Sequence, residues 1–401
     1  MQSRTPTKLN LLALRRHYTD PHGLYDALRA QGGLAFDAGS QSWLATGHTI
    51  ITKVLDTPLF LSGSGAASSS TAAPISSVNR QMLFLDGARH RRAQDVLLRP
   101  LALLVKSMPE IIRHYARQAL DEARGRGEME VVSQFAAPVS LLSIAHVLGM
   151  PQADREELQQ LERWSDTFGD VTSGYFHGDM QDIARLEDYF RRLIAQKRRH
   201  PGADLLSAFL QATEVFPDEE DLVANCMMVF AAGRITTKKL LGNGIAQLLS
   251  QWQEIHHACQ ENPRFPRLLG EELLRRITPT RYLMRAAGQD IAPSTLYAGN
   301  PAIERGQRLL LFLEAANYDP AVFPQPEQLQ LQRRPNKHLA FGYGPHQCPG
   351  ATLARVEIQI ALEEVLRLPA LQTRPGSEPI WNPNPNLGGF TSHCVLLPGS
   401  L

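Results

Sequence analysis

The stretch FGYGPHQCPG, residues 341–350, has the composition of a loop that holds one cysteine sulfur against a metal cofactor. A thiolate is a strong, soft metal ligand, and it needs an enclosed, hydrogen-bonded pocket to stay deprotonated and unoxidised. Gly342, Gly344 and Gly350 predict tight turns that direct backbone N–H groups at the sulfur of Cys348, because glycine reaches backbone angles closed to other residues. The alternative is a surface turn that contains a cysteine by chance.

The residues around Cys348 favour the metal-binding interpretation. Phe341 can shield one side of the site, and His346 offers a hydrogen-bond donor for an anionic edge of a cofactor. Residues 351–358 (ATLARVEI) have helical periodicity, so Cys348 lies just before a predicted helix. The dipole of such a helix lowers the pKa of a thiol at its N-terminus.

The spacing F-G-x-G-x-H-x-C-x-G is similar to the heme-binding signature of the cytochrome P450 family. The resemblance implies heme b (iron protoporphyrin IX), with Cys348 as the axial ligand of the iron and with Phe341, Gly342 and Gly350 in the cofactor-binding loop. It implies a mainly α fold with a small β region, in which the heme lies between a long central helix and the helix after the cysteine. We therefore expect a single domain over residues 1–401, with a helical core at about residues 88–275 and β-rich parts toward both termini.

A long apolar stretch, Leu222–Leu249, follows the acidic run Asp218–Asp221 and predicts the central helix, since acidic side chains suit the positive end of a helix dipole. Within it, AAGRITT (231–237) resembles the family motif A-G-x-D/E-T, which marks a local distortion that makes room for dioxygen. A glycine there lets a ligand approach the backbone, and a threonine hydroxyl can interrupt the helical hydrogen bonds. The resemblance places three residues at the oxygen site: Ala232, Gly233 and Thr236.

Two residues of this motif depart from the family pattern. Ile235 stands where an acid usually helps to pass protons, so the usual proton route is in doubt. Arg234 has three interpretations: a solvent-facing side chain without chemical consequence, an anchor for a substrate carboxylate or phosphate, or a group that feeds protons or binds peroxide in place of the acid. The first is favoured, because neighbouring helix positions diverge by about 100°.

Glu272 and Arg275 match the family pattern E-x-x-R. Residues three apart lie on one helix face and can form a buried, hydrogen-bonded pair, although an exposed ion pair would look the same in sequence. Their place between the central helix and the cysteine loop favours the family interpretation, in which the pair supports that loop.

Three residues are expected to hold the heme propionates. Arg285 follows Pro279 in a P-x-x-x-x-x-R pattern, and His90 lies in LDGARHRR (85–92), which resembles the family's D-P-P-E-H-T-R-L-R. The third is His346 of the cysteine loop. A surface position is the alternative for His90. Gln94 replaces a common second arginine, so one propionate contact is lost or taken over by a neighbour.

The bulk properties restrict the possible partners. The chain has 401 residues, 43% of them hydrophobic, and a net charge of +1, so neither nucleic acid nor an anionic membrane is expected. The other cysteines, at 226, 259 and 394, lack disulfide or zinc spacing, which fits a reducing cytoplasm. The N-terminal residues are polar, and no apolar run approaches the roughly 20 residues of a membrane span. Residues from about 10 to 32 predict a helix with polar flanks, residues 42–46 predict a short strand, and residues 62–77, rich in Ser and Gly, predict a loop.

The resemblance implies a cytoplasmic heme-thiolate monooxygenase that oxidises a small organic substrate in secondary metabolism. Electrons are expected from a ferredoxin or flavodoxin with a separate reductase, because the chain has no dinucleotide-binding fingerprint. Two alternatives stay open. Since Ile235 replaces the acid, the reaction can be atypical: peroxide-driven oxidation, coupling, dehydration or nitric oxide chemistry. The protein can also be a heme-containing binding protein without turnover.

Overall fold

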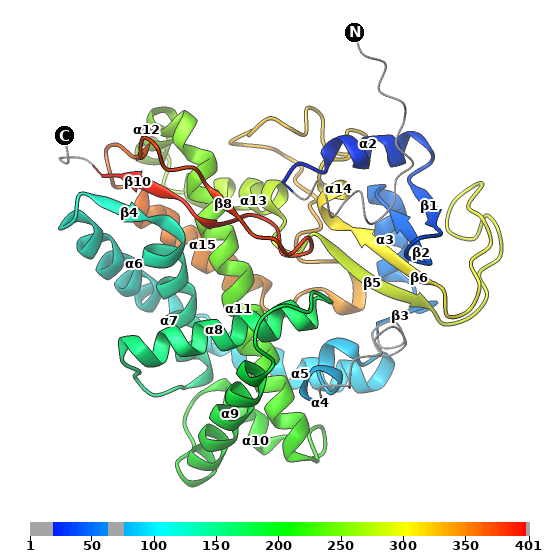
Figure 1. Ribbon diagram of the computed structural model, residues 1–401, viewed down its shortest axis with the longest axis horizontal. Helices are drawn as coiled ribbons and strands as arrows, with labels where there is room; N and C mark the ends of the chain where they lie inside the picture. Colours follow the sequence, from blue (N-terminus) through cyan, green and yellow to red (C-terminus); the bar gives the residue numbers. More distant parts are fainter. Residues whose placement is uncertain (1–18, 63–75, 398–401) are drawn as a thin grey trace.

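Most of the chain is helical in the computed structural model, which describes residues 19–62 and 76–397 (Figure 1). The α-helices are α2 (His22–Ala30), α3 (His48–Asp56), α4 (Ser76–Asn79), α5 (Gly87–Leu104), α6 (Met108–Arg124), α7 (Ala137–Leu148), α8 (Arg155–Thr172), α9 (Gln181–Arg199), α10 (Leu205–Gln211), α11 (Glu219–Leu248), α12 (Trp252–Glu261), α13 (Phe265–Ile277), α14 (Leu313–Asn317) and α15 (Ala351–Val365). Shorter turns of helix are η1 (Met82–Phe84), η2 (Val131–Ala136), η3 (Leu249–Gln251) and η4 (Gly344–His346).

The strands form a smaller region. A five-stranded sheet has the order β1-β2-β6-β5-β3, with β2 and β6 parallel and the other pairs antiparallel. Its strands are β1 (Leu34–Asp37), β2 (Ser42–Ala45), β3 (Phe60–Leu61), β5 (Tyr282–Ala287) and β6 (Arg308–Phe312). Two small sheets use β4 (Glu128–Glu130), β7 (Gln372–Thr373), β8 (Ile380–Trp381), β9 (Phe390–Ser392) and β10 (Cys394–Leu396).

Helix α11 forms the centre of the helical region, where it crosses the molecule between α7, α8, α13 and α15 (Figure 1). Glu219, Glu220 and Asp221 occupy its first turn, as the acidic run predicts. Apolar residues occur on all sides of it, which is typical of a helix enclosed by other helices. Among the described residues, one segment, Val131–Leu148, is long and apolar enough by length and composition to cross a membrane, and 67% of it is buried inside the protein.

The predicted fold class, mainly α with a small β region, is confirmed. The strand expected at residues 42–46 is β2. The helix expected from about residue 10 to residue 32 is described only from residue 19 onward, where α2 begins at His22. The Ser-rich segment lies almost wholly outside the described residues.

Candidate functional site

The cysteine loop is closed by its own backbone. The N–H of Cys348 donates to the carbonyl oxygen of Phe341 over 2.8 Å. Gly342 and Gly344 both have φ of 69°, in the left-handed region that favours glycine. At Gly344 a Cβ atom would lie 2.6 Å from the carbonyl oxygen of Leu55, so a larger residue would push the loop off α3. Gly350 differs from the prediction, because its φ is an ordinary −80° and it serves as the N-cap of α15.

The thiol of Cys348 faces two opposing influences. Part of the residue is accessible to solvent. The many protein atoms packed around the sulfur still remove most of its hydration, and this desolvation raises the pKa of the thiol. Hydrogen bonds from the backbone N–H groups of Gly350 and Ala351, together with the charge of Arg355, lower the same pKa. The predicted position just before a helix N-terminus is confirmed, since α15 begins at Ala351. These donors are placed to stabilise a thiolate once a metal binds it.

His90, His346 and Arg285 converge from three separate elements. The ring of His90, on α5, stacks on that of His346, in the cysteine loop, with 3.8 Å between their centroids. The Nε2 atom of His346 lies 3.2 Å from Oδ1 of Asp86. Arg285, on β5, is 7% exposed and acts electrostatically on both histidines. Together these side chains form a hydrogen-bond-donating cluster beside the loop.

Burial determines the charge state of this cluster. It lowers the pKa of His346 to about 4, with help from His90 and Arg285, and it lowers the pKa of His90. It also lowers the pKa of Arg285 to about 10. Burial destabilises the positively charged forms of these groups. An anionic ligand stabilises those forms again, because its charge and its hydrogen bonds offset the lost hydration.

Gln94 does not join this cluster. Its side-chain amide donates to the carbonyl oxygens of Pro345 (3.3 Å) and Gln347 (3.5 Å). The residue that replaces the usual arginine therefore fastens α5 to the cysteine loop.

The predicted oxygen-binding turn of α11 is a regular helix. Thr236 donates its hydroxyl to the carbonyl oxygen of Ala232 over 2.8 Å, and the helix continues without a break on either side. The distortion expected there is absent from α11. Ala232 is exposed and Thr236 is half-buried. Gly233 serves helix packing, since a Cβ atom there would lie 2.7 Å from Cδ1 of Ile144 on α7.

Arg234 is fully buried, at 0% exposure, so the solvent-facing interpretation is wrong. Its Nε donates to Oγ of Ser165 (2.9 Å), and its Nη1 lies 3.3 Å from Oε1 of Glu162. Its Nη2 donates to the carbonyl oxygen of Glu162 (3.1 Å) and to Asp166. Lys238 joins the same two carboxylates, at 2.9 Å and 3.0 Å. This cluster fastens α11 to α8.

These contacts also bear on the other two interpretations of Arg234. The guanidinium group already has partners for each of its nitrogens within the protein. Binding a substrate anion or peroxide would require some of these bonds to break. The structure therefore supports a structural role for Arg234.

We expect Arg234→Met to lower the free energy of unfolding by about 2 kcal/mol, since a hydrogen-bonded charged group is lost while Lys238 still bonds both carboxylates. Denaturant unfolding measures this. Lys238→Met, which removes the more accessible of the two cations, is the matched control and should cost less. An unchanged stability together with weakened substrate binding in Arg234→Met would contradict the structural role and favour an anion anchor.

Ile235 packs in the interface between α8 and α11. It is 4% exposed, and a Cβ atom on Gly169 of α8 would lie 2.3 Å from its Cδ1. Position 235, which usually carries an acid in the family, is thus occupied by an isoleucine that packs against α8, the helix to which Arg234 is bonded.

The pair Glu272–Arg275 is buried, as the family pattern predicts. Their exposures are 1% and 0%, and Nε and Nη2 of Arg275 donate to the two carboxylate oxygens over 2.9 and 2.8 Å. Arg275 also donates to the carbonyl oxygens of Asn317 and Pro326, both at 2.8 Å. Arg333 donates to Glu272 at 3.2 Å. The pair therefore organises the segment that leads to the cysteine loop.

Two buried ionisable groups near α11 were not singled out from the sequence. Glu357, on α15, is 2% exposed, accepts from the hydroxyl of Thr237 at 3.5 Å, and has its pKa raised to about 8 by burial. Lys239 is 5% exposed and donates to the carbonyl oxygen of Leu387 over 2.9 Å; burial lowers its pKa to about 7. A lysine within an apolar stretch is a visible signal for the second group, whereas nothing in the sequence marks the first.

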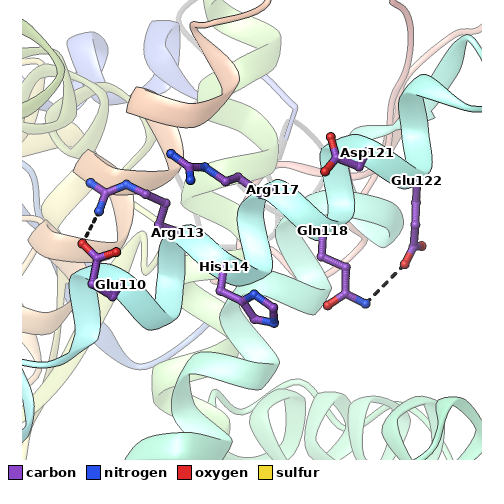
Figure 2. A pocket seen from close by; sticks show the side chains of 7 residues that line it. All are labelled: Glu110, Arg113, His114, Arg117, Gln118, Asp121 and Glu122. Atoms are coloured by element: carbon purple, nitrogen blue, oxygen red, sulfur yellow. Dashed lines mark hydrogen bonds and ion pairs between the residues drawn. The ribbon is translucent and has the colours of Figure 1, made fainter.

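Two hollows in the surface lie apart from the cysteine loop. One, of about 470 Å³, runs along α6, and Figure 2 shows that one helix supplies all its labelled residues. Its arginines, Arg113 and Arg117, already pair with Glu364 of α15. The other, of about 390 Å³, is lined by Gly174, Tyr175, Phe176, Pro383 and Pro385. The second lies at the end of α8, where Asn384 donates to Asp170 over 2.7 Å.

The residues present fit a heme. The sulfur of Cys348 has backbone donors directed at it, and the cluster of His90, His346 and Arg285 suits the two carboxylates of protoporphyrin IX. A cysteine loop of this kind beside a long central helix defines a heme-thiolate protein.

Comparisons with known proteins agree. A sequence profile described as Cytochrome P450 matches residues 270–394. The biotin biosynthesis cytochrome P450 of Bacillus subtilis is 32% identical over 373 residues, which cover 88% of this chain and 90% of that protein. Cytochrome P450 monooxygenase PikC of Streptomyces venezuelae is 30% identical over 96% of this chain and 93% of its own.

A solved structure extends the likeness to the fold. P450BioI in complex with an acyl carrier protein ligated to hexadec-9Z-enoic acid has a TM-score of 0.85 and 28% identity, covering 96% of this chain and 100% of that chain. The chain belongs to the cytochrome P450 family. It is a heme-containing oxidoreductase of monooxygenase type.

Proposed function

We propose that this P450 hydroxylates, or oxidises in a related tailoring step, a small organic substrate in secondary metabolism, with Cys348 as the axial ligand of the heme iron. The observation that carries the proposal is the cysteine loop, which the bond from the N–H of Cys348 to the carbonyl oxygen of Phe341 closes and which places the sulfur just before the N-terminus of α15. When bound, the heme supplies oxidation by dioxygen and two electrons, while the protein supplies orientation and electrostatics.

The protein side of the site divides into two faces. On the thiolate face, Phe341, Gly342 and Gly350 shape the loop. His90, His346 and Arg285 bind the propionates, a role supported by their convergence and by the burial that penalises their positive charge. The other face is the part of α11 around Ala232, Gly233 and Thr236, which is not fully buried. There the hydroxyl of Thr236 holds a proton on Oγ1.

The relatives suggest candidate substrates and partners. P450BioI was solved with a fatty acyl group on a carrier protein, so carrier-bound acyl compounds are candidate substrates here, beside free small molecules. We propose electron supply by a ferredoxin or flavodoxin with a separate reductase, and a cytoplasmic location, on the likeness to the bacterial relatives.

The test compares electron sources on the heme-loaded protein. A panel of free and carrier-bound fatty acyl and polyketide compounds is first screened for substrate-induced shifts of the heme absorption band. Compounds that bind are then incubated with a ferredoxin–reductase system or with hydrogen peroxide. Hydroxylated product that depends on reductase and dioxygen supports the proposal. Product formed only with peroxide would favour the atypical chemistry, and absence of product from every tightly bound compound would favour a binding protein.

Restoring an acid at position 235 tests the proton route. We expect Ile235→Glu to raise the fraction of consumed electrons that appear in product, because a general acid typically contributes about 10²–10⁴-fold to a proton-transfer step. The ratio of product formed to reduced nicotinamide consumed measures this. Ile235→Gln, which has the same size without the acid, is the control. Equal ratios in both variants and the wild type would mean that this protein delivers protons by a route independent of position 235.

A further inference from the structure

A cation lies over the aromatic ring beside the cysteine. The guanidinium carbon of Arg355, on α15, is 4.5 Å from the centroid of the Phe341 ring. The carbonyl oxygen of Phe341 accepts the N–H of Cys348 over 2.8 Å, so ring and cysteine belong to one hydrogen-bonded turn. Contacts of this kind between a cation and an aromatic face are attractive.

Two residues outside the loop fix Arg355 in this position. Glu271, on α13, accepts from Nε of Arg355 at 2.7 Å and from Nη2 at 3.3 Å. The Nε2 atom of His338 lies 3.1 Å from the second oxygen of Glu271, and the ring of His338 contacts that of Phe341, with 5.9 Å between centroids. Phe341, Arg355, Glu271 and His338 thus form a closed ring of contacts, which we call the proximal ring.

The proximal ring is a stable ionic arrangement. Although burial raises the pKa of Glu271, hydrogen bonds from His338 and Arg355 lower it to about 2, so the carboxylate stays charged at neutral pH. Both hydrogen bonds of Arg355 go to one carboxylate, a geometry that holds a guanidinium group in a single orientation. Its side chain is 38% exposed, yet it is not free to leave Phe341 without losing these bonds.

The charge of Arg355 reaches the cysteine. Arg355 lies over the ring of Phe341, whose carbonyl oxygen accepts the N–H of Cys348, so its positive charge is one residue removed from the ligand. A positive charge beside a redox centre stabilises the state that has gained an electron. Reduction of a thiolate-bound ferric heme adds one electron from an external donor and moves no proton or bond.

We propose that Glu271 and His338 hold Arg355 over Phe341 so that its charge raises the reduction potential of the thiolate-bound heme. Arg355 is then a positioning residue for the ligand side of the site. The inference rests on heme binding at Cys348 and goes beyond the proposed function. Two of the three guanidinium nitrogens of Arg355, Nε and Nη2, are already bonded to Glu271.

The test is a spectroscopic redox titration with dithionite of the full-length, heme-loaded protein. We expect Arg355→Gln to lower the equilibrium constant for reduction by about tenfold, which is a shift of about 59 mV to more negative potential for one electron. Arg355→Lys keeps the charge but loses the fork that binds Glu271, so its potential should lie between those of Arg355→Gln and the wild type. Arg367→Gln is the control: Arg367 lies just beyond the end of α15, 57% exposed and paired with Glu364, and its loss should leave the potential unchanged.

Three outcomes would overturn the proposal. The first is an Arg355→Gln potential equal to that of the wild type. The second is a raised KM for ferredoxin without a change of potential, which would make Arg355 a docking residue. If Arg355→Gln does not retain heme, the comparison passes to Arg355→Met, which also removes the charge but keeps an unbranched side chain. The third outcome is a potential of Arg355→Met equal to that of the wild type. Failure of the proposed function is separate, because it would appear as missing reductase-dependent product while the redox titration of the heme-loaded wild type could still be carried out.

Discussion

Cys348→Ser is expected to abolish thiolate ligation and to lower monooxygenase activity by at least about 10³-fold, equivalent to about 4 kcal/mol of transition-state stabilisation. A hydroxyl group is a far poorer ligand than a thiolate and does not supply the electron density that favours O–O cleavage. The measurement is the absorption spectrum of the reduced, carbon monoxide-bound protein, followed by turnover with a reductase system.

Cys394→Ser is the matched control for this change. Cys394 lies on β10 and is half-buried, so the substitution makes the same chemical change on a small sheet outside the cysteine loop. Its spectrum and activity should match those of the wild type. A thiolate-type spectrum that survives in Cys348→Ser, or is lost in Cys394→Ser, would show that the axial ligand has been misassigned.

The second large effect is expected at Arg275. Arg275→Met should lower the free energy of unfolding by about 3–5 kcal/mol, because it leaves the buried carboxylate of Glu272 without its main partner. The carbonyl groups of Asn317 and Pro326 lose their donor as well. We expect the protein to lose heme at lower denaturant concentration, since these contacts organise the segment that leads to the cysteine loop.

Denaturant unfolding monitored by circular dichroism and by heme absorption measures this effect. Arg276→Met is the control, because the neighbouring arginine is partly exposed and bonds Gln247 and the carbonyl oxygen of Glu327. It should cost no more than about 1 kcal/mol. Equal unfolding midpoints for Arg275→Met and the wild type would contradict a supporting role for the buried pair.

The cysteine loop could be predicted from sequence because its geometry is local. Glycine at positions 342 and 344, a cysteine four residues after the second glycine and a helix after position 350 together determine the turn. The buried pair of Glu272 and Arg275 was predictable for a similar reason, since the spacing of a helix face is a local property.

The errors concern contacts between distant segments. Arg234 was expected to face solvent. It is buried by Ser165, Glu162 and Asp166, which lie about 70 residues earlier in the chain, so the local sequence does not reveal this burial. The proximal ring shows the same limit, since Glu271 and Arg355 are 84 residues apart. The regular helix at Thr236 is a different kind of error, because the distortion was expected from the family motif, whereas the observed hydrogen bond to Ala232 is local.

The charge cluster that joins α8 to α11 also determines how easily α8 can move as a unit. Lifting α8 would strip a fully buried guanidinium group of its partners, so opening by movement of the whole helix carries a high barrier. The loop segments at the end of α8, around Tyr175 and Pro383, lie outside this cluster, so they can move without breaking it.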